Sequence, residues 1–226
     1  MCVLHFSLPD GQRVSVEVRS VLNAGFSGRS DDVVAAHIAE LAALGIPAPN
    51  VTPCLYPVAP YLATQSGEVL VQHGRTSGEV EWALVITRDD VLLTVASDHT
   101  DRDLERHGVG WSKQVAPNVL SHQAWRFAEV AERMDAMTLT AWVRNGEWTE
   151  IQNGTCADLQ PPKYWLDVME ANNLHVPGTV LMSGTLPMRR GVNQFADAWR
   201  GELSDPTTGR TLTAEYHVRR LPDPIA

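Results

Sequence analysis

A pair of apolar stretches joined by a short polar turn constrains the fold of this chain most strongly. Residues 79–86 and 91–96 have the composition of strands, and Arg88-Asp89-Asp90 supplies the turn between them. Glu79 and Glu81 open the first stretch. Because side chains alternate faces along a strand, both carboxylates leave the same face close together. The sequence therefore predicts two neighbouring strands with paired acids at one end.

Paired acids of this kind have two interpretations. Two neighbouring carboxylates repel each other unless a cation lies between them. Asp98 follows the second stretch and could complete an all-oxygen site, which suits hard divalent ions such as magnesium, manganese or calcium. Glu-Val-Glu before an apolar run is also typical of the solvated end of a half-buried strand. The pattern alone leaves both interpretations open.

Patterns typical of strands dominate the remainder of the chain. Asp10-Gly11 and Asn145-Gly146 stand between alternating stretches and predict two hairpins. Further strands are expected over residues 3–8, 13–18, 68–72, 139–144, 147–152, 179–183, 199–203 and 211–221. Helices are expected between Ser30 and Gly45 and over residues 101–107, 124–134 and 161–172. Because strands arrive in clusters with few helices between them, the sequence favours a mostly β, roll-like or barrel-like α+β fold.

Charge and cysteine content exclude several functional classes. The 226 residues include 18 basic and 27 acidic side chains, a net charge of −9. No basic run could bind a row of phosphates, so neither nucleic acid nor an anionic membrane is an expected partner. Cys2, Cys54 and Cys156 suit neither a disulfide framework nor a zinc site. No signal peptide or membrane-spanning run is evident, so a cytoplasmic protein is expected.

Four blocks occur in the same order as in a known superfamily. They are His37-Ile38-Ala39-Glu40, Glu79-Val80-Glu81, Asp98 to Asp103 followed by Lys113, and Pro177-Gly178-Thr179 with Ser183-Gly184-Thr185. On these blocks the chain resembles the fumarylacetoacetate hydrolase superfamily, in a branch of short bacterial proteins of unknown function. The resemblance implies a mixed β-sandwich roll with a few peripheral helices, and a homodimer. No linker is evident, so a single domain is expected over residues 1–226, with 1–29 as an N-terminal hairpin region and 30–220 as the hydrolase-like core.

The resemblance also implies roles for individual residues. Glu79, Glu81 and Asp98 would hold a divalent cation, most often magnesium and sometimes manganese or calcium. His37 and Glu40 stand three apart on a helix and would form a dyad, in which the glutamate orients an imidazole that activates water. A core histidine and a solvated helix charge are the ordinary alternatives for these two. Lys113 would polarise a substrate carbonyl or bind its carboxylate, although most lysines are surface residues.

Substrate contacts are expected from Tyr56, Arg102, Gly184, Thr185 and Arg189. Tyr56 stands before a proline where the superfamily often has a lysine. Arg102 is also expected to pair with its neighbour Asp103, and the segment with Gly184 and Thr185 could equally be an ordinary turn. The sequence after Thr185 departs from the superfamily pattern, so Arg189 could either replace the lost positive charge or be an ordinary surface residue.

These features favour a metal-dependent hydrolase or lyase that acts on a small oxo-acid, such as a β-diketo acid or an acylpyruvate. In that scheme the metal stabilises an enolate, and the His37–Glu40 dyad activates water. A β-keto acid decarboxylase, a tautomerase or a hydratase could use the same metal platform, and a non-catalytic small-molecule binding module is a further alternative. The sequence contains no nucleotide-binding glycine motif and no Gly-x-Ser-x-Gly elbow.

Overall fold

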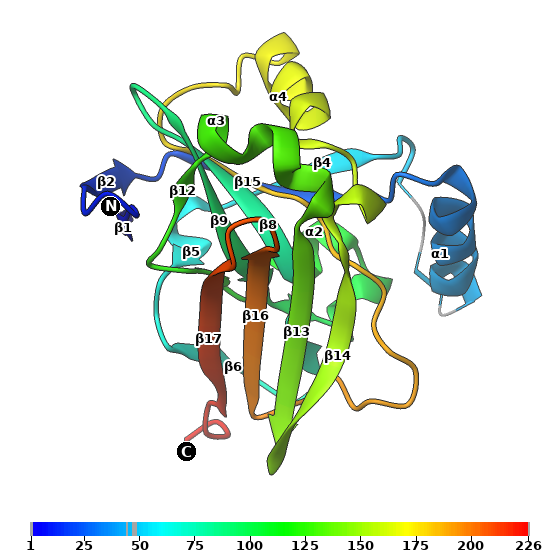
Figure 1. Ribbon diagram of the computed structural model, residues 1–226. Helices are drawn as coiled ribbons and strands as arrows, with labels where there is room; N and C mark the ends of the chain where they lie inside the picture. Colours follow the sequence, from blue (N-terminus) through cyan, green and yellow to red (C-terminus); the bar gives the residue numbers. More distant parts are fainter. Residues whose placement is uncertain (1, 44, 47–48, 226) are drawn as a thin grey trace.

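Two packed β-sheets form the body of the protein (Figure 1). The computed structural model describes residues 2–43, 45–46 and 49–225, except for the side chains of residues 37, 40 and 41. The larger sheet has the order β4 (Cys54–Val58), β3 (Ser20–Gly25), β15 (Thr179–Met182), β8 (Val80–Ile86), β9 (Val91–Asp98), β11 (Asn118–Leu120) and β5 (Ala63–Thr64), with β12 (Trp125–Arg126) beside β9. The smaller sheet has the order β14 (Glu147–Thr155), β13 (Thr138–Asn145), β16 (Ala198–Asp205), β17 (Arg210–Arg220) and β6 (Glu68–Val71).

Short elements surround the two sheets. The N-terminal hairpin pairs β1 (Val3–Ser7) with β2 (Arg13–Glu17), and β7 (Thr76–Ser77) pairs with β10 (Thr100–Asp101). The helices are α1 (Asp31–Ala43), α2 (Val109–Gln114), α3 (Phe127–Val130) and α4 (Pro162–Ala171). Among the described residues, no helix is long and apolar enough to cross a membrane. The structure is thus the mostly β, mixed roll with a few peripheral helices that the sequence predicted.

The hairpin β8–β9 lies at the centre of the larger sheet, and every residue of β8 is buried. Trp82 and Leu84 face the smaller sheet and pack into the core between the two sheets. Ala83 and Val85 point to the opposite face, where they join a second core beneath the N-terminal hairpin. Burial on both faces explains why this stretch reads as a continuous apolar run after its two acids.

Two expected helices are wrong in part. Within residues 124–134, Trp125 and Arg126 are extended and pair with β9, so helical structure begins only at Phe127. Arg126 also donates to Asp90, at the turn between β8 and β9. Ladder pairing and this ion pair outweigh the helical pattern of the segment. The expected helix over 101–107 is a single turn over Leu104–Arg106 that follows β10.

Among the strands of the larger sheet that the sequence did not indicate, β3 and β4 are the longest. β3 lies in its interior, parallel to β15. β4 forms its edge and contains Pro57, which has no N–H to give to a ladder and is therefore tolerated at an edge. β15 alone separates β3 from β8, the strand that contains Glu81.

Candidate metal centre

The three acids singled out in the sequence converge in the structure. Glu79 directly precedes β8, Glu81 is the second residue of β8, and Asp98 ends β9. The Asp98 N–H donates to the carbonyl oxygen of Glu79 at 3.0 Å, which aligns the ends of the two strands. One carboxylate oxygen from each residue lies within 4.8 Å of the others. The strand pairing predicted from the sequence therefore produces the predicted cluster.

Two of these carboxylates are completely buried and only partly satisfied. Glu81 and Asp98 are both 0% exposed. Glu81 accepts a hydrogen bond from the Gly184 N–H at 2.7 Å through Oε2. Glu81 Oε1 and Asp98 Oδ1 accept no hydrogen bond from the residues that the structure describes. Because a buried anionic oxygen without a donor is costly, this all-oxygen set fits a hard divalent cation.

Lys113 is the cation that lies directly against the cluster. It projects from α2, is 5% exposed, and donates to Asp98 Oδ2 and to Glu79 Oε2, the latter at 3.3 Å. Burial alone would lower the pKa of Lys113, but Asp98 and the two glutamates outweigh it and raise the pKa above its ordinary value. Lys113 is thus a buried, charged member of the site and not a surface lysine.

Burial and charge act differently on the three acids. Burial alone would raise the pKa of Glu79, but Lys113 and Arg102 outweigh it and lower the pKa to about 2. Burial, reinforced by the charge of Asp98, raises the pKa of Glu81 well above its ordinary range. Burial also raises the pKa of Asp98, although Lys113 opposes the shift. Glu81 is therefore the acid that most needs an added positive charge.

Arg102 orients Glu79 from the other side. Its guanidinium donates to Glu79 Oε1 and to Glu105 Oε1, both at 2.8 Å, and to Ser77 Oγ at 2.6 Å. The expected pair between Arg102 and Asp103 is wrong, because Asp103 accepts from Arg75 instead. Each guanidinium nitrogen of Arg102 already has a protein acceptor, so its evident task is to hold Glu79.

Gly184 and Thr185 also lie at the cluster, but their polar groups are already used. Gly184 has a φ of +76° and directs its N–H at Glu81. The Thr185 hydroxyl donates to the Val80 carbonyl oxygen at 2.7 Å and accepts from Gln152 Nε2 at 2.8 Å. The segment therefore holds the Glu81 carboxylate through Gly184 and the β8 main chain through Thr185, and substrate contacts from it stay a prediction.

The remaining expected residues differ in their placement. Tyr56 on β4 is half-buried, and burial raises the pKa of its phenol, which is therefore neutral. The charge of Lys113 opposes this shift, so the phenol lies within electrostatic range of that ammonium. Arg189 is 67% exposed, and its ionic contact is with Glu150 at 3.8 Å. The structure thus favours the ordinary surface role for Arg189. The helix α1 carries His37 and Glu40, whose side chains lie outside the described part of the chain.

A pair of buried amides near the acids escaped the sequence reasoning. Asn23 on β3 and Asn118 on β11 exchange hydrogen bonds, at 2.9 Å and 3.3 Å, and both are 0% exposed. Three strands separate β3 from β11 in the sheet, so this contact shows that the sheet curls around the face that bears the carboxylates. Asn118 is also the register partner of Asp98. An asparagine inside the apolar run at residues 21–24 was the available signal.

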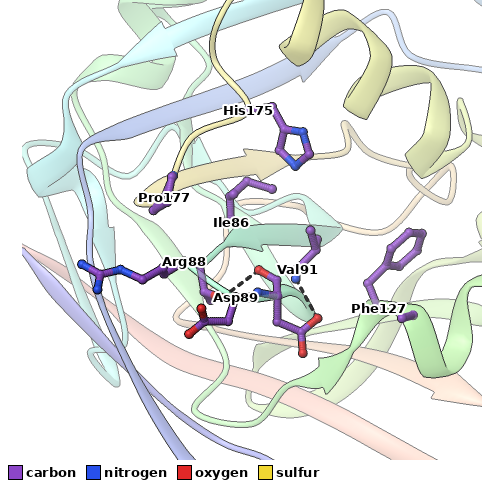
Figure 2. A pocket seen from close by; sticks show the side chains of 10 residues that line it. Ile86, Arg88, Asp89, Val91, Phe127, His175 and Pro177 are labelled. Carbon is purple, nitrogen blue, oxygen red and sulfur yellow. Dashed lines mark hydrogen bonds between the residues drawn. The ribbon is translucent and has the colours of Figure 1, made fainter.

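A surface hollow lies at the far end of the same hairpin. Figure 2 shows it at the turn between β8 and β9, with Ile86, Arg88, Val91, Phe127 and His175 around it. Ile86 is five residues beyond Glu81 along β8, which at about 3.3 Å per residue is roughly 16 Å. The hollow is therefore separate from the three acids.

Comparison with protein-family models identifies the family of the chain. A family model described as "Protein of unknown function (DUF2848)" matches residues 24–216. The chain belongs to the DUF2848 family. The matched region contains all three acids, together with Lys113 and Gly184. No curated protein matches this member of the DUF2848 family.

Solved structures show where this DUF2848 fold recurs. The apo form of 2-keto-3-deoxy-D-arabinonate dehydratase is similar with a TM-score of 0.67 and 18% identity, over 92% of this chain and 75% of that chain. The same dehydratase complexed with magnesium and 2,5-dioxopentanoate gives 0.65 and 17%, over 92% and 75%. 4-Oxalocrotonate decarboxylase from Pseudomonas putida G7, complexed with calcium and acetate, gives 0.54 and 16%, over 88% and 76%. At these identities the likeness shows the fold, which is the fumarylacetoacetate hydrolase type that the sequence blocks implied.

Proposed function

We propose that this DUF2848 protein is a divalent-metal-dependent enzyme that acts on a small oxo-acid. Glu79, Glu81 and Asp98 would hold the ion, with magnesium as the first choice and manganese or calcium as alternatives. The observation that carries the proposal is the convergence of these three carboxylates within 4.8 Å, where Glu81 and Asp98 each keep a buried oxygen without a donor. An isolated cluster of surface acids would have no such oxygens, because water would satisfy them.

The substrate class is supported by the similar structures. Their names specify a keto-acid dehydratase and a decarboxylase, with magnesium and 2,5-dioxopentanoate in one case and calcium and acetate in another. Both named activities are lyase reactions, so we place dehydration or decarboxylation of an oxo-acid first. Hydrolysis of a carbon–carbon bond is the second candidate, and the spacing of His37 and Glu40 on α1 favours it.

The residues around the acids have distinct tasks in this scheme. When bound, the ion would serve as a Lewis acid toward the keto and carboxylate oxygens of the substrate. Lys113 keeps a buried positive charge on the same side and would bind the substrate carboxylate. Gly184 holds Glu81 through its N–H, and Arg102 holds Glu79 through its guanidinium. Fixed ligands cost less reorganisation when the substrate binds.

Metal titration of a matched set of variants tests the proposal. Isothermal calorimetry with Mg²⁺ or Mn²⁺ is expected to show one site per chain, lost in Glu81→Gln and retained in Glu147→Gln, which alters an exposed acid on β14. A rise in the melting temperature with oxalate or pyruvate should then require the divalent ion and the organic acid together. Unchanged metal affinity in Glu81→Gln would contradict the proposed ligand set. Stabilisation by neither compound would instead favour a binding module of another kind.

Variants at residue 37 separate the two reaction classes. If water activation by the dyad is required, His37→Ala should abolish hydrolysis of an acylpyruvate. Retained decarboxylation or dehydration in the same variant would support the lyase assignment.

The expected homodimer stays a prediction, which light scattering of the purified protein would check.

A further inference from the structure

A chain of four hydrogen-bonded side chains lies behind the acids. Thr76 Oγ1 lies 2.9 Å from His99 Nε2, and His99 Nδ1 lies 3.0 Å from the Tyr216 hydroxyl oxygen. The Tyr216 hydroxyl in turn lies 2.9 Å from Ser97 Oγ. His99, Thr76, Ser97 and Tyr216 are all buried, so solvent does not compete for these bonds.

The chain ends on the backbone of a proposed ligand. Ser97 Oγ accepts a hydrogen bond from the Glu79 N–H at 3.3 Å, while the carbonyl oxygen of Glu79 accepts from the Asp98 N–H at 3.0 Å. Both polar groups of the Glu79 main chain are therefore held by the end of β9. His99 comes directly after Asp98, so the hydrogen bonds of its ring fix the main chain that follows Asp98.

Close packing leaves this arrangement little freedom. Gly78 precedes Glu79, and a Cβ atom there would lie 2.7 Å from Ser97 Oγ and 2.7 Å from the Trp199 ring. Such an atom would also collide with the Tyr216 hydroxyl. A side chain at residue 78 would therefore push Glu79 away from Ser97. The glycine allows the strand to lie directly against the hydrogen-bonded chain.

Tyr216 comes from the other sheet. It lies on β17, whereas Glu79 and Asp98 belong to the β8–β9 hairpin of the larger sheet. Figure 1 shows β17 in front of that hairpin. The Tyr216 hydroxyl bonds Ser97 and His99, the residues on either side of Asp98. A buried tyrosine hydroxyl usually finds a hydrogen-bond partner, and here both partners are the residues that flank Asp98.

We propose that Tyr216, held by His99, is a positioning residue that sets the spacing of Glu79 and Asp98 and thereby the affinity of the metal site. The inference rests on the proposed function, because it assigns Tyr216 a role at the same ion. It acts through Ser97 and the Glu79 main chain and makes no contact with the ion. Outer partners of metal ligands commonly change affinity by about 10–100-fold when removed.

The test measures metal affinity and stability separately in the full-length protein. Mn²⁺ is titrated calorimetrically into the wild type, Tyr216→Phe, Ser97→Ala, the double variant, and Tyr164→Phe as a control on the helix α4. Tyr216→Phe removes only the hydroxyl, and we expect Kd for Mn²⁺ to rise about tenfold. Ser97→Ala should give a similar rise, and Tyr164→Phe none. Tyr216 and Ser97 act through the same series of hydrogen bonds. The Kd of the double variant for Mn²⁺ should therefore be no higher than that of the weaker-binding single variant.

The outcomes separate the inference from the function on which it rests. A purely structural Tyr216 would lower the free energy of unfolding in EDTA while Kd stays within twofold of the wild type, and that result overturns the inference. Additive losses in the double variant overturn it as well. Should Tyr216→Phe not fold, Ser97→Ala alone decides the question by the same criterion. Absence of Mn²⁺ binding by the wild type overturns the proposed function, and the inference with it.

Discussion

The Lys113 ammonium lies 3.3 Å from Glu79 Oε2 inside the protein, where the lysine side chain is 6% exposed and the glutamate side chain 14%. This contact decides how the three acids coexist. Lys113 and Arg102 hold Glu79 ionised, whereas Glu81 is left as the acid with the most strongly raised pKa. The site therefore needs both its own cations and one more positive charge to carry three carboxylates.

Loss of the buried ammonium should destabilise the protein. In the absence of added metal, Lys113→Met leaves Asp98 buried without its cation and Glu79 with Arg102 alone, and it is expected to cost about 3 kcal/mol of the free energy of unfolding. Lys163→Met is the control, because Lys163 is 82% exposed and pairs with Asp167 on the helix surface. The control should cost under about 0.5 kcal/mol in urea denaturation. Equal losses in the two variants would contradict the account.

The effect of Glu81→Gln on stability should depend on pH, and it should change sign when a divalent ion is added. Its pKa is raised above the ordinary 4.5, so the folded state holds this proton more tightly than the unfolded state. That contribution to stability is present below pH 4.5 and is lost as the pH rises toward the folded pKa. Glu81→Gln imitates the protonated form, and in EDTA its advantage over the wild type should grow between about pH 5 and pH 8.

With a divalent ion present, the order should invert, because only the wild type gains stability from metal binding. Thermal unfolding of both proteins across that pH range, with EDTA and then with Mg²⁺, provides the measurement. A difference in melting temperature between the two proteins that stays constant at every pH would show that the pKa of Glu81 is not raised in the folded state.

Gly184 should tolerate a methyl group less well than another glycine of the same conformation. Gly184 and Gly191 have φ values of +76° and +81°. Alanine at residue 191 meets no atom within 4 Å and should cost about 1 kcal/mol for its backbone conformation alone. Alanine at residue 184 collides with Ser27 and should cost about 2 kcal/mol more. Urea denaturation gives both values, and comparable values would argue against the close packing of Gly184 on Ser27.

The forked contacts of Arg102 should not be reproduced by lysine. Arg102→Lys keeps the charge but cannot reach Glu79, Glu105 and Ser77 together, so a loss of about 2 kcal/mol and weaker metal binding are expected. Arg75→Lys alters an exposed pair with Asp103 and should cost under about 1 kcal/mol. Calorimetric titration and urea denaturation of both variants check this. Wild-type metal affinity in Arg102→Lys would remove Arg102 from the site.

Local patterns explain why the acid cluster could be predicted. The apolar run after the two glutamates and the turn at residues 88–90 specify β8 and β9, and their pairing alone brings Asp98 to the two glutamates. Lys113 could be named only through the resemblance, because its burial depends on how α2 packs against the larger sheet. The Arg102–Asp103 pair failed for the same reason, since tertiary packing turns the two side chains toward different partners.

Contacts between distant segments could not be read from the sequence. Asn23 and Asn118 are 95 residues apart and meet only because the larger sheet curls. Tyr216 reaches Ser97 across 119 residues, from a strand of the other sheet. Trp125 and Arg126 carry a helical pattern but are extended because β9 offers an open ladder. In each case the deciding partner lies outside the window in which periodicity is informative.

The central claim is that Glu79, Glu81 and Asp98 bind one divalent ion together. Anomalous diffraction from crystals grown with Mn²⁺ tests it most directly. The account predicts a single strong anomalous peak between these three carboxylates, in contact with the Glu81 and Asp98 oxygens that lack protein donors. A fully occupied Mn²⁺ site elsewhere, with no peak among the three acids, would contradict it.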